Sequence, residues 1–232
     1  MRQLLKKYLP PNTFQKIKRS YNAFQYSYIP CWKPVHRLLY LSHQTVIHLW
    51  QNSVQKLYFT PLFLSQITNS PEQIHLYSGM PQLLGALKIT IGERCRISGI
   101  STWSGRISNA DVAEIQIGDN VDIGWQNILA SGTQIQIDDN ARLAGKVFLA
   151  GYPGHPENAE DRAKGKADTP IQIGRIHIKK NAWIGTGAII LANVTIGEGS
   201  IVAAGSIVTH NIPNFVLVAG NPARIMRSVE RA

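Results

Sequence analysis

The chain has 232 residues with ordinary apolar content and few charged residues, which excludes a disordered protein and allows a sizeable core in one or two domains. Its 24 Lys and Arg outnumber its 14 Asp and Glu, and the excess lies in residues 1–85, which hold nine cations and one acid. The N-terminus has no apolar signal-peptide core, and no run approaches 18 uncharged apolar residues. We therefore expect a cytoplasmic protein without a membrane span.

The first expected element is a helix within residues 1–60. Its apolar residues are spaced three and four apart, which places them on one helix face. These residues are Phe14, Ile17, Tyr21, Phe24 and Tyr28. Asn12 or Thr13 can cap the start of this helix, and Pro30 ends it.

A second helix is expected over residues 35–59, closed by Pro61. Its apolar stripe consists of Leu39, Val46, Trp50, Val54 and Leu57. Residues 61–85 contain three prolines and two glycines, and we interpret them as a linker with short extended pieces.

From residue 178 the sequence repeats in sixes: IKKNAW, IGTGAI, ILANVT, IGEGSI, VAAGSI and VTHNIP. Each hexad begins with a β-branched residue: Ile178, Ile184, Ile190, Ile196, Val202 and Val208. A strand alternates with period two and a helix turns with period 3.6, so a period of six fits neither. It is typical of a parallel β-helix, in which three hexads close a triangular coil that stacks ~4.8 Å above the last one. Weaker hexads precede it from about residue 88, so we expect roughly six coils.

The repeat is interrupted once and then ends. Residues 151–172 have no hexad, and a long excursion from a regular solenoid is usually functional. Residues 214–232 leave the repeat, and we expect Ala223–Arg231 to form a short helix that caps the last coil.

Several motifs together resemble those of the hexapeptide-repeat acyltransferases, in particular galactoside and maltose O-acetyltransferases and acetyltransferases of exopolysaccharide and lipopolysaccharide biosynthesis. The motifs are Gly-His-Pro (154–156), Trp-Ile-Gly (183–185), AAGSIVT (203–209) and IPNFVLVAGNPAR (212–224). The resemblance covers roughly residues 88–232. It implies a left-handed parallel β-helix, a homotrimer, and acetyl-CoA bound between neighbouring subunits. We therefore expect a mainly β chain with a basic, largely helical region over 1–85 and an acyltransferase domain over 86–232.

Acetyl transfer from a thioester to a hydroxyl needs a base with a pKa near 7, for which histidine is suited. His155 stands between Gly154 and Pro156, which leave its imidazole accessible, and the Gly-His-Pro motif resembles the catalytic motif of the galactoside enzymes. We predict His155 as the general base; the alternative is a solvent-facing loop histidine. Nearby acids that would orient it are Glu157, Glu160 and Asp161, which are equally interpreted as solvated loop charges.

The resemblance also implies a binding site for acetyl-CoA. Arg224 and Arg227, one helical turn apart, match arginines that contact the nucleotide end of the donor, and two guanidiniums suit its phosphates. Further positions match donor contacts: Trp183, Thr186, Ala204, Thr209 and His210. His210 departs from the lysine frequent there. The alternatives are solvated arginines and a Trp183 that packs at a coil corner.

The acceptor site is less marked. Asn127 lies near an acceptor-binding asparagine of the galactoside enzymes, while their acceptor-binding aspartate has no equivalent nearby. We predict O-acetylation of a sugar or surface-glycan intermediate. The alternatives are N-acylation of an amino-sugar nucleotide and a non-catalytic scaffold, which would need neither His155 nor the two arginines.

Other chemistry is less favoured. His177 and His210 lie in different coils from His155, so we predict no metal site. Cys31 and Cys95 are interpreted as reduced thiols, and Cys95 falls on an inward hexad position.

The N-terminal region combines cations with apolar helix faces. These suit an anionic membrane surface, so residues 1–60 are a candidate for peripheral contact with the membrane. The alternative is that the helices pack on the β-helix or on another subunit. The region has no recognisable nucleic-acid motif, and we expect no nucleic-acid partner.

Overall fold

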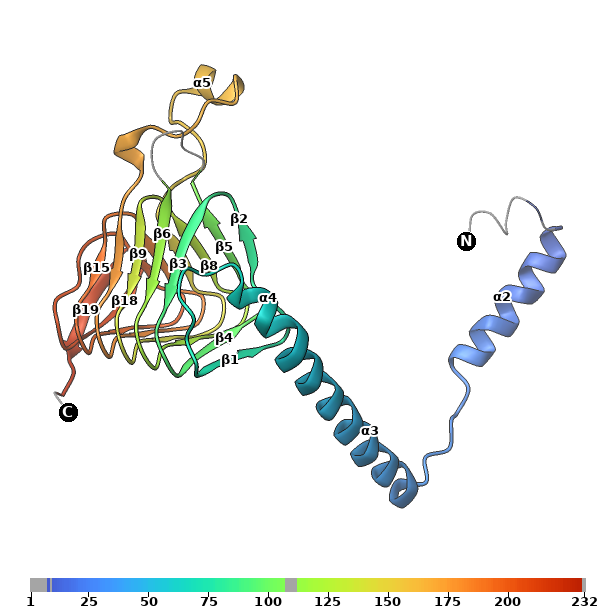
Figure 1. Cartoon of the computed structure of the whole chain (residues 1–232). Coiled ribbons are helices and arrows are strands. Elements are labelled where there is room, and N and C mark those ends of the chain that lie inside the picture. The colour runs from blue at the N-terminus through green and yellow to red at the C-terminus, as the bar shows by residue number, and fades with distance from the viewer. Residues whose placement is uncertain (1–7, 9, 107–111, 231–232) are drawn as a thin grey trace. The chain divides into compact units, whose positions relative to one another are not determined.

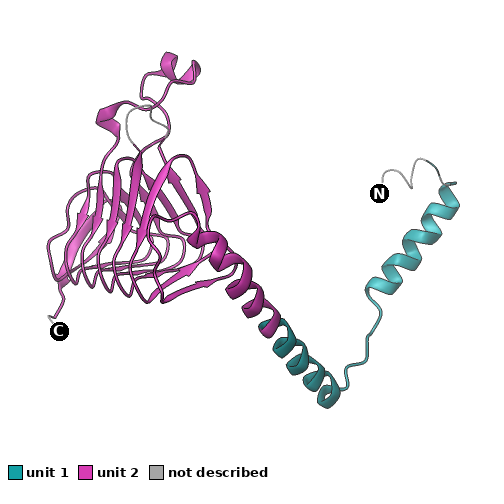
Figure 2. Ribbon diagram, viewed as in Figure 1, with its two compact units in different colours: residues 1–48 teal, residues 49–232 magenta. Residues whose placement is uncertain are grey.

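The structure is a computed structural model that describes residue 8, residues 10–106 and residues 112–230 (Figure 1). It divides into two compact units, Met1–His48 and Leu49–Ala232 (Figure 2). Each unit is described by itself. Three cations that we counted in the N-terminal region, Arg2, Lys6 and Lys7, lie outside the described residues.

The first unit contains helix α2 (Pro11–Gln25) and the start of helix α3 (Lys33–Val54). Helix α2 has Pro10 as its N-cap and no side-chain cap, so the expected capping by Asn12 or Thr13 is wrong. Pro11 is the first helical residue. Proline suits this position because its φ is already helical and its missing N–H would have had no partner there. No residue of α2 or α3 is buried.

The second helix continues beyond its expected end. Helix α3 passes into a π-helical turn η1 (Gln55–Phe59) and then into α4 (Thr60–Leu64). Pro61 therefore does not close the helix. In the π turn the N–H of Thr60 donates to Gln55 O, five residues back, and Pro61 falls in the first turn of α4, where its missing N–H costs little. Phe63 of α4 is fully buried with its ring edge-to-face on Trp103, at 5.6 Å between centroids.

The second unit is a β-helix of three parallel sheets, with one antiparallel strand at the end of sheet A. Sheet A has the order β1 (Ile74–Tyr77), β4 (Cys95–Ser98), β7 (Asp122–Ile123), β10 (Arg142–Leu143), β13 (Trp183–Ile184), β16 (Ile201–Val202), β18 (Val216–Gly220) and β19 (Ala223–Ser228). Sheet B has the order β2 (Gln82–Leu84), β5 (Thr102–Gly105), β8 (Ile128–Ser131), β11 (Phe148–Ala150), β14 (Ile189–Leu191) and β17 (Ile207–Val208). Sheet C has the order β3 (Leu87–Ile91), β6 (Ala113–Ile117), β9 (Gln134–Ile137), β12 (Ile176–Ile178) and β15 (Thr195–Ile196).

The expected fold is confirmed by this arrangement, since stacked parallel sheets fit the left-handed β-helix that the resemblance implies. The β-branched residues that begin the six hexads from Ile178 to Val208 are all fully buried. The small or branched residues at the fifth hexad position are buried with them, from Ala182 to Ile212. The hexads therefore identify the side chains that form the core.

The first coil begins earlier than residue 86. Strand β1 pairs with β4 and β2 with β5, so residues expected to form a linker already belong to the β-helix. Ser78, Gly79 and Gly85 have φ of 60°, 93° and 72°, which marks them as turn residues between strands. Turn residues at coil corners have the same composition as a linker, which is why the sequence pattern concealed this coil.

Asparagines fill the corner between sheets C and A. Asn120, Asn140 and Asn181 have φ between 53° and 60°, a left-handed conformation that asparagine tolerates better than most residues. Their side chains form a ladder along the stack, from Asn120 Nδ2 to Asn140 Oδ1 (2.8 Å) and from Asn140 Nδ2 to Asn181 Oδ1 (3.1 Å).

The expected C-terminal helix is wrong. Residues Ala223–Ser228 form strand β19, which pairs antiparallel with β18. An added strand satisfies the backbone groups at the edge of the last coil, which a helix packed over it would leave unpaired.

The interruption of the repeat is an excursion between β11 and β12, as expected (Figure 1). It contains a short helix α5 (Ala159–Ala163) and a 3₁₀ turn η2 (Pro170–Gln172). Asn158 caps α5 by accepting from Asp161 N–H. A second connection leaves sheet B after β5 and returns to sheet C at β6, and its first residue is Arg106.

Candidate active site

His155 lies on the excursion, which leaves the corner between sheets B and C after β11. Gly154 has a φ of +83°, and a β carbon there would meet nothing within 4 Å, so the left-handed backbone rather than crowding favours glycine. His155 is exposed while Pro156 is buried. Among the described residues none is hydrogen-bonded to the imidazole, which leaves both ring nitrogens open to a ligand.

Two of the three acids considered as partners of His155 pair with lysines instead. Asp161 lies 2.6 Å from Lys166 and Glu160 lies 3.8 Å from Lys164, while Glu157 contributes its main-chain carbonyl, which accepts from Arg162. None contacts the imidazole.

Sequence reasoning missed the acid that does reach the neighbourhood of His155. Asp168 is buried, and its Oδ2 accepts from Gly154 N–H at 3.3 Å. Its Oδ1 lies 2.5 Å from Arg106 Nε, and Arg106 Nη2 also donates to Asp168 O at 3.0 Å. Nothing in the hexad pattern links residues 62 positions apart, so this contact had no sequence signal.

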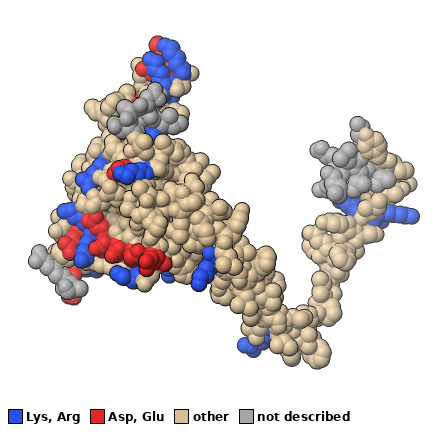
Figure 3. Space-filling model, viewed as in Figure 1, with Lys and Arg blue, Asp and Glu red and all other residues tan. Residues whose placement is uncertain are grey.

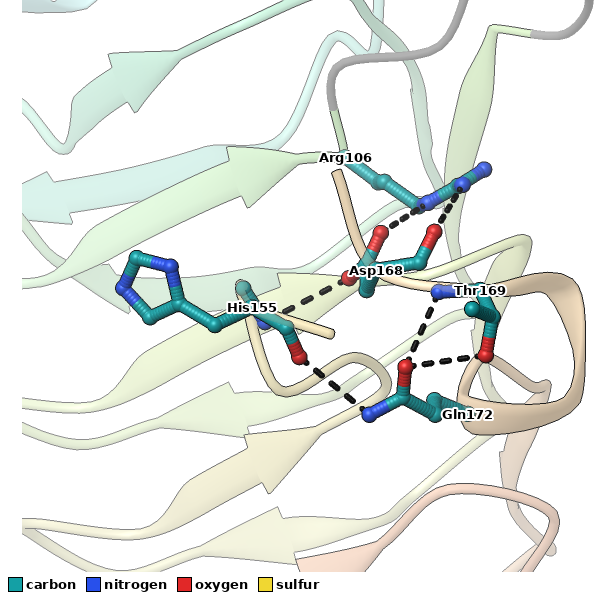
Figure 4. A network of polar contacts seen from close by, with 6 residues as sticks. Arg106, His155, Asp168, Thr169 and Gln172 are labelled. Atoms are coloured by element: carbon teal, nitrogen blue, oxygen red, sulfur yellow. Dashed lines mark hydrogen bonds and ion pairs between the residues drawn. The ribbon is translucent and has the colours of Figure 1, made fainter. Parts of the chain in front are cut away.

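Gln172 holds the other side of His155. Its Nε2 donates to His155 O at 3.2 Å, and its Oε1 accepts from the N–H and hydroxyl of Thr169, both at 2.9 Å. In Figure 4 the imidazole points away from this network, while the main chain beside it is hydrogen-bonded at Gly154 N–H and at His155 O.

The residues predicted for the donor lie partly on the outer face of sheet A. The strand pairing places Trp183 beside Ile201, Ile201 beside Leu217, and Leu217 beside Arg227. Cross-strand partners face the same side of a sheet. We call these four residues the sheet A row. Trp183 is 52% exposed, so it is not the packed corner residue of the alternative interpretation.

Arg224 and Arg227 share this face, although the helix expected to align them is absent. They pair with Ala219 and Leu217, which are two residues apart and therefore on one face of β18. In a regular strand, residues three apart face opposite sides of the sheet. A bulge leaves Met226 without a partner in this register, and this extra residue places Arg224 and Arg227 on the same side. Among the described residues neither guanidinium forms an ion pair.

The remaining donor positions divide between two corners. Thr186 and Ala204 are exposed at the corner between sheets A and B, and Gly205 N–H donates to Thr186 O. Thr209 and His210 follow β17 at the corner between sheets B and C, with Thr209 Oγ1 2.8 Å from His210 Nδ1. A single chain therefore does not gather all the predicted residues, because His155 lies at one corner and the sheet A row on another face.

Asn127 does not fit an acceptor contact. Its side chain is fully buried inside the coil, where its Oδ1 accepts from Val147 N–H at 2.7 Å. Among the described residues its Nδ2 has no hydrogen-bond partner. The structure therefore directs Asn127 into the core.

Cys95 is a core residue, as its hexad position indicated. It is fully buried, and the loss of solvation by burial raises the pKa of its thiol, which disfavours a reactive thiolate. In the described part of the chain no cluster of three His, Cys, Asp or Glu side chains could hold a metal ion. No described helix is long and apolar enough to cross a membrane.

A shallow groove of about 440 Å³ lies elsewhere, on the outer face of sheet C. Polar side chains line it, among them Gln116, Gln136, Asp138 and Lys180. None of the predicted site residues lines this groove, and the chemistry of His155 therefore lies apart from it.

Comparison with known proteins places these features in a family context. The family described as bacterial transferase hexapeptide (six repeats) matches residues 175–210. The chain is 36% identical over 118 residues to a candidate acetyltransferase of Saccharomyces cerevisiae, covering 50% of this chain and 57% of that protein. It is 37% identical over 118 residues to the galactoside O-acetyltransferase of Escherichia coli, covering 50% and 55%. The chain thus spans little more than half the length of these curated relatives.

Among solved structures, the N-acyltransferase AntD from Bacillus cereus, in complex with dTDP and 3-hydroxybutyryl-CoA, has a TM-score of 0.56. The match has 21% identity and covers 78% of this chain and 89% of that one, which shows a shared fold. The predicted resemblance is confirmed: the chain carries the hexapeptide repeat, and its relatives include acetyltransferases.

Proposed function

We propose that this hexapeptide-repeat chain transfers an acetyl group from acetyl-CoA to a hydroxyl of a sugar or surface-glycan intermediate, with His155 as the general base. The observation that carries the proposal is an exposed imidazole to which no described residue forms a hydrogen bond, on main chain fixed by Asp168 and Gln172. The relatedness to the galactoside O-acetyltransferase of Escherichia coli supports the reaction class.

In this reaction a ring nitrogen of His155 takes the proton of the acceptor hydroxyl as its oxygen attacks the thioester carbonyl. The carbon–sulfur bond then breaks, the acetyl ester forms, and the proton passes from the imidazolium to the departing thiolate. A histidine suits both steps because its unperturbed pKa lies near neutrality.

The donor is proposed to lie along the sheet A row. From Trp183 to Arg227 the row spans three strand spacings, ~14 Å, so an extended arm that contacts the exposed indole can place phosphates near the arginines. Thr186 and Ala204 at the adjacent corner add backbone groups and room for that arm. Thr209 and His210 share the corner of His155 and are proposed to contact the donor near the reacting end.

The test of the proposed function is mass spectrometry of the full chain incubated with acetyl-CoA and a panel of sugars, glycan fragments and amino-sugar nucleotides. A mass increase of one acetyl group on a hydroxyl acceptor supports the proposal. Acetylation confined to amines favours the N-acyltransferase alternative. Absence of any acetylated product, with acetyl-CoA intact, favours a scaffold.

We further propose a homotrimer assembled through the outer face of sheet B. Its pairing aligns Ile128, Phe148, Ile189 and Ile207 in one outward apolar row. By contrast, the corresponding row of sheet C contains Thr90, Gln116, Gln136, His177 and Thr195. An exposed apolar sheet face suits a second copy of the chain. It is bordered by the corner of His155 and by that of Thr186, so a neighbour there can complete the site.

Replacing Ile189 by Asp should break the trimer, because a carboxylate at the centre of this face would lose its hydration on assembly. We expect the mass in light scattering after gel filtration to fall from three times to one times the chain mass of 25.7 kDa. Thr195→Asp on sheet C is the matched control and should remain trimeric. A trimeric Ile189→Asp variant would exclude this face.

The N-terminal unit is proposed to contact the anionic cytoplasmic face of a membrane, and the protein to be cytoplasmic. Helix α2 carries Tyr21 and Phe24, which are 65% and 79% exposed, together with Lys16, Lys18 and Arg19. No acid occurs before Glu72, and Figure 3 shows Lys and Arg but no Asp or Glu on the visible face of helices α2 and α3. Cations beside exposed aromatic side chains suit the headgroup region.

Substituting Lys16, Lys18 and Arg19 by Gln in the full chain should weaken binding to anionic vesicles by about 10²-fold at low salt, at ~1 kcal/mol for each cation. Co-sedimentation with anionic and neutral vesicles measures this. Replacing Arg162, Lys164 and Lys166 of the excursion by Gln removes the same charge and should have little effect. If wild-type protein stays in the supernatant with anionic vesicles, the helices have a structural role instead.

A further inference from the structure

The excursion that carries His155 is tied to a second, distant segment by a buried ion pair. The side chains of Arg106 and Asp168 are 15% and 3% exposed, and Arg106 grips both the carboxylate and the carbonyl of Asp168. Burying two charges is expensive, and an ion pair of this kind often adds little stability over apolar packing. Elsewhere on the excursion the ion pairs are largely exposed, so a geometric role for this one is the more economical explanation.

The pair acts on the main chain beside His155. Asp168 presents one oxygen to Arg106 and the other to Gly154 N–H. The guanidinium therefore fixes the carboxylate, and the carboxylate fixes the peptide group between Pro153 and Gly154, one residue before His155. Gln172, itself held by Thr169, fixes the carbonyl that follows. The main chain is therefore anchored one residue before His155 and directly after it, while the imidazole points away from both anchors (Figure 4).

We infer that Asp168 is a positioning residue for His155, supported by Arg106 and assisted by Gln172. This inference rests on the proposed function. A general base must lie within hydrogen-bond reach of the proton it removes, and small displacements lower the rate steeply. A histidine on a glycine-preceded loop would otherwise sample many positions. Anchors at Gly154 N–H and at His155 O restrict this short segment and leave the ring to align with the acceptor.

The test is Asp168→Asn in the full chain, made alone and in a His155→Ala background. Asparagine keeps the size and one acceptor oxygen but loses the charge that Arg106 holds. We expect kcat to fall about tenfold in the wild-type background, with the affinity for acetyl-CoA unchanged. In the His155→Ala background we expect no further loss, because a residue that acts through His155 has nothing left to position.

Asp161→Asn is the matched control, since Asp161 is an ion-paired acid of the same excursion that does not contact Gly154 or His155. Its kcat should stay within twofold of wild type. Arg106→Lys and Gln172→Ala give a second measurement if Asp168→Asn folds poorly. Each should lower kcat without weakening donor binding.

Three outcomes separate the possibilities. Unchanged kcat in Asp168→Asn and Gln172→Ala, with His155→Ala inactive, would overturn the positioning role and leave the proposed base intact. Equal losses in both backgrounds would show a general structural role. Wild-type turnover in His155→Ala would overturn the base itself, and the positioning role with it.

Discussion

Replacing His155 by Ala should lower kcat for acetyl transfer by at least ~10²-fold, while the dissociation constant for acetyl-CoA stays within about twofold of wild type. A general base acts on the acceptor proton, so its contribution appears in the transition state rather than in donor binding. Steady-state kinetics on an acceptor identified in the mass-spectrometric panel gives kcat, and calorimetric titration gives the donor affinity.

The structure makes this result specific to one histidine. The imidazole of His155 has no hydrogen-bond partner among the described residues, whereas His177 Nε2 lies 2.8 Å from Asp138 Oδ2 on the outer face of sheet C. His177 therefore lies apart from the excursion, with one ring nitrogen already engaged. His155 is thus the better candidate on chemical grounds as well as by motif.

The matched control is His75→Ala. His75 is exposed on β1, the first strand of sheet A, and lies outside the excursion. Its replacement should leave kcat within twofold of wild type. Wild-type turnover in His155→Ala would show that another group removes the proton.

The repeating core could be predicted from the sequence because the six-residue period of apolar and small residues indicates which side chains face inward. Each hexad start from Ile178 to Val208 is buried, and so is each fifth position. The first coil escaped detection because its corners carry Gly79, Gly85 and neighbouring prolines, which give the same signal as a linker.

Two of the wrong expectations have a common origin, since the local sequence pattern does not decide between alternatives that the folded structure settles. Residues Ala223–Ser228 form a strand because the edge of β18 offers hydrogen bonds to it. Pro61 lies inside a helix because a π turn precedes it. The sequence pattern indicates neither the pairing with β18 nor the π turn.

The site was only partly predictable for the same reason. His155 could be identified because the Gly-His-Pro motif that distinguishes it is continuous in sequence. Asp168 and Arg106 meet because two connections leave the same corner of the β-helix, two coils apart. That juxtaposition depends on the stacking register, which a pattern containing irregular segments does not specify.

Replacing both Arg224 and Arg227 by Ala should weaken acetyl-CoA binding by at least ~10-fold. Charge-assisted hydrogen bonds to phosphate contribute about 1.5–3 kcal/mol each, and 1.4 kcal/mol corresponds to a factor of ten. The bulge in β19 places both guanidiniums on one face, where neither is engaged by a described carboxylate, so both are available to an anionic ligand. Calorimetric titration with CoA and with dephospho-CoA, which lacks the 3′-phosphate, measures the effect.

If the arginines bind that phosphate, wild-type protein should prefer CoA over dephospho-CoA and the double variant should lose the preference. Arg96→Ala is the matched control, because Arg96 is exposed on the outer face of the same sheet but lies 3.8 Å from Asp122. It is three strands beyond Trp183, at the end of the sheet opposite Arg227. Its CoA affinity should be unchanged. Equal affinities in wild type and the double variant would exclude this end of the row as a phosphate site. Because Trp183 lies three strands from Arg227, a Trp183→Ala change that still weakened binding would then confine the donor to the opposite end of the row.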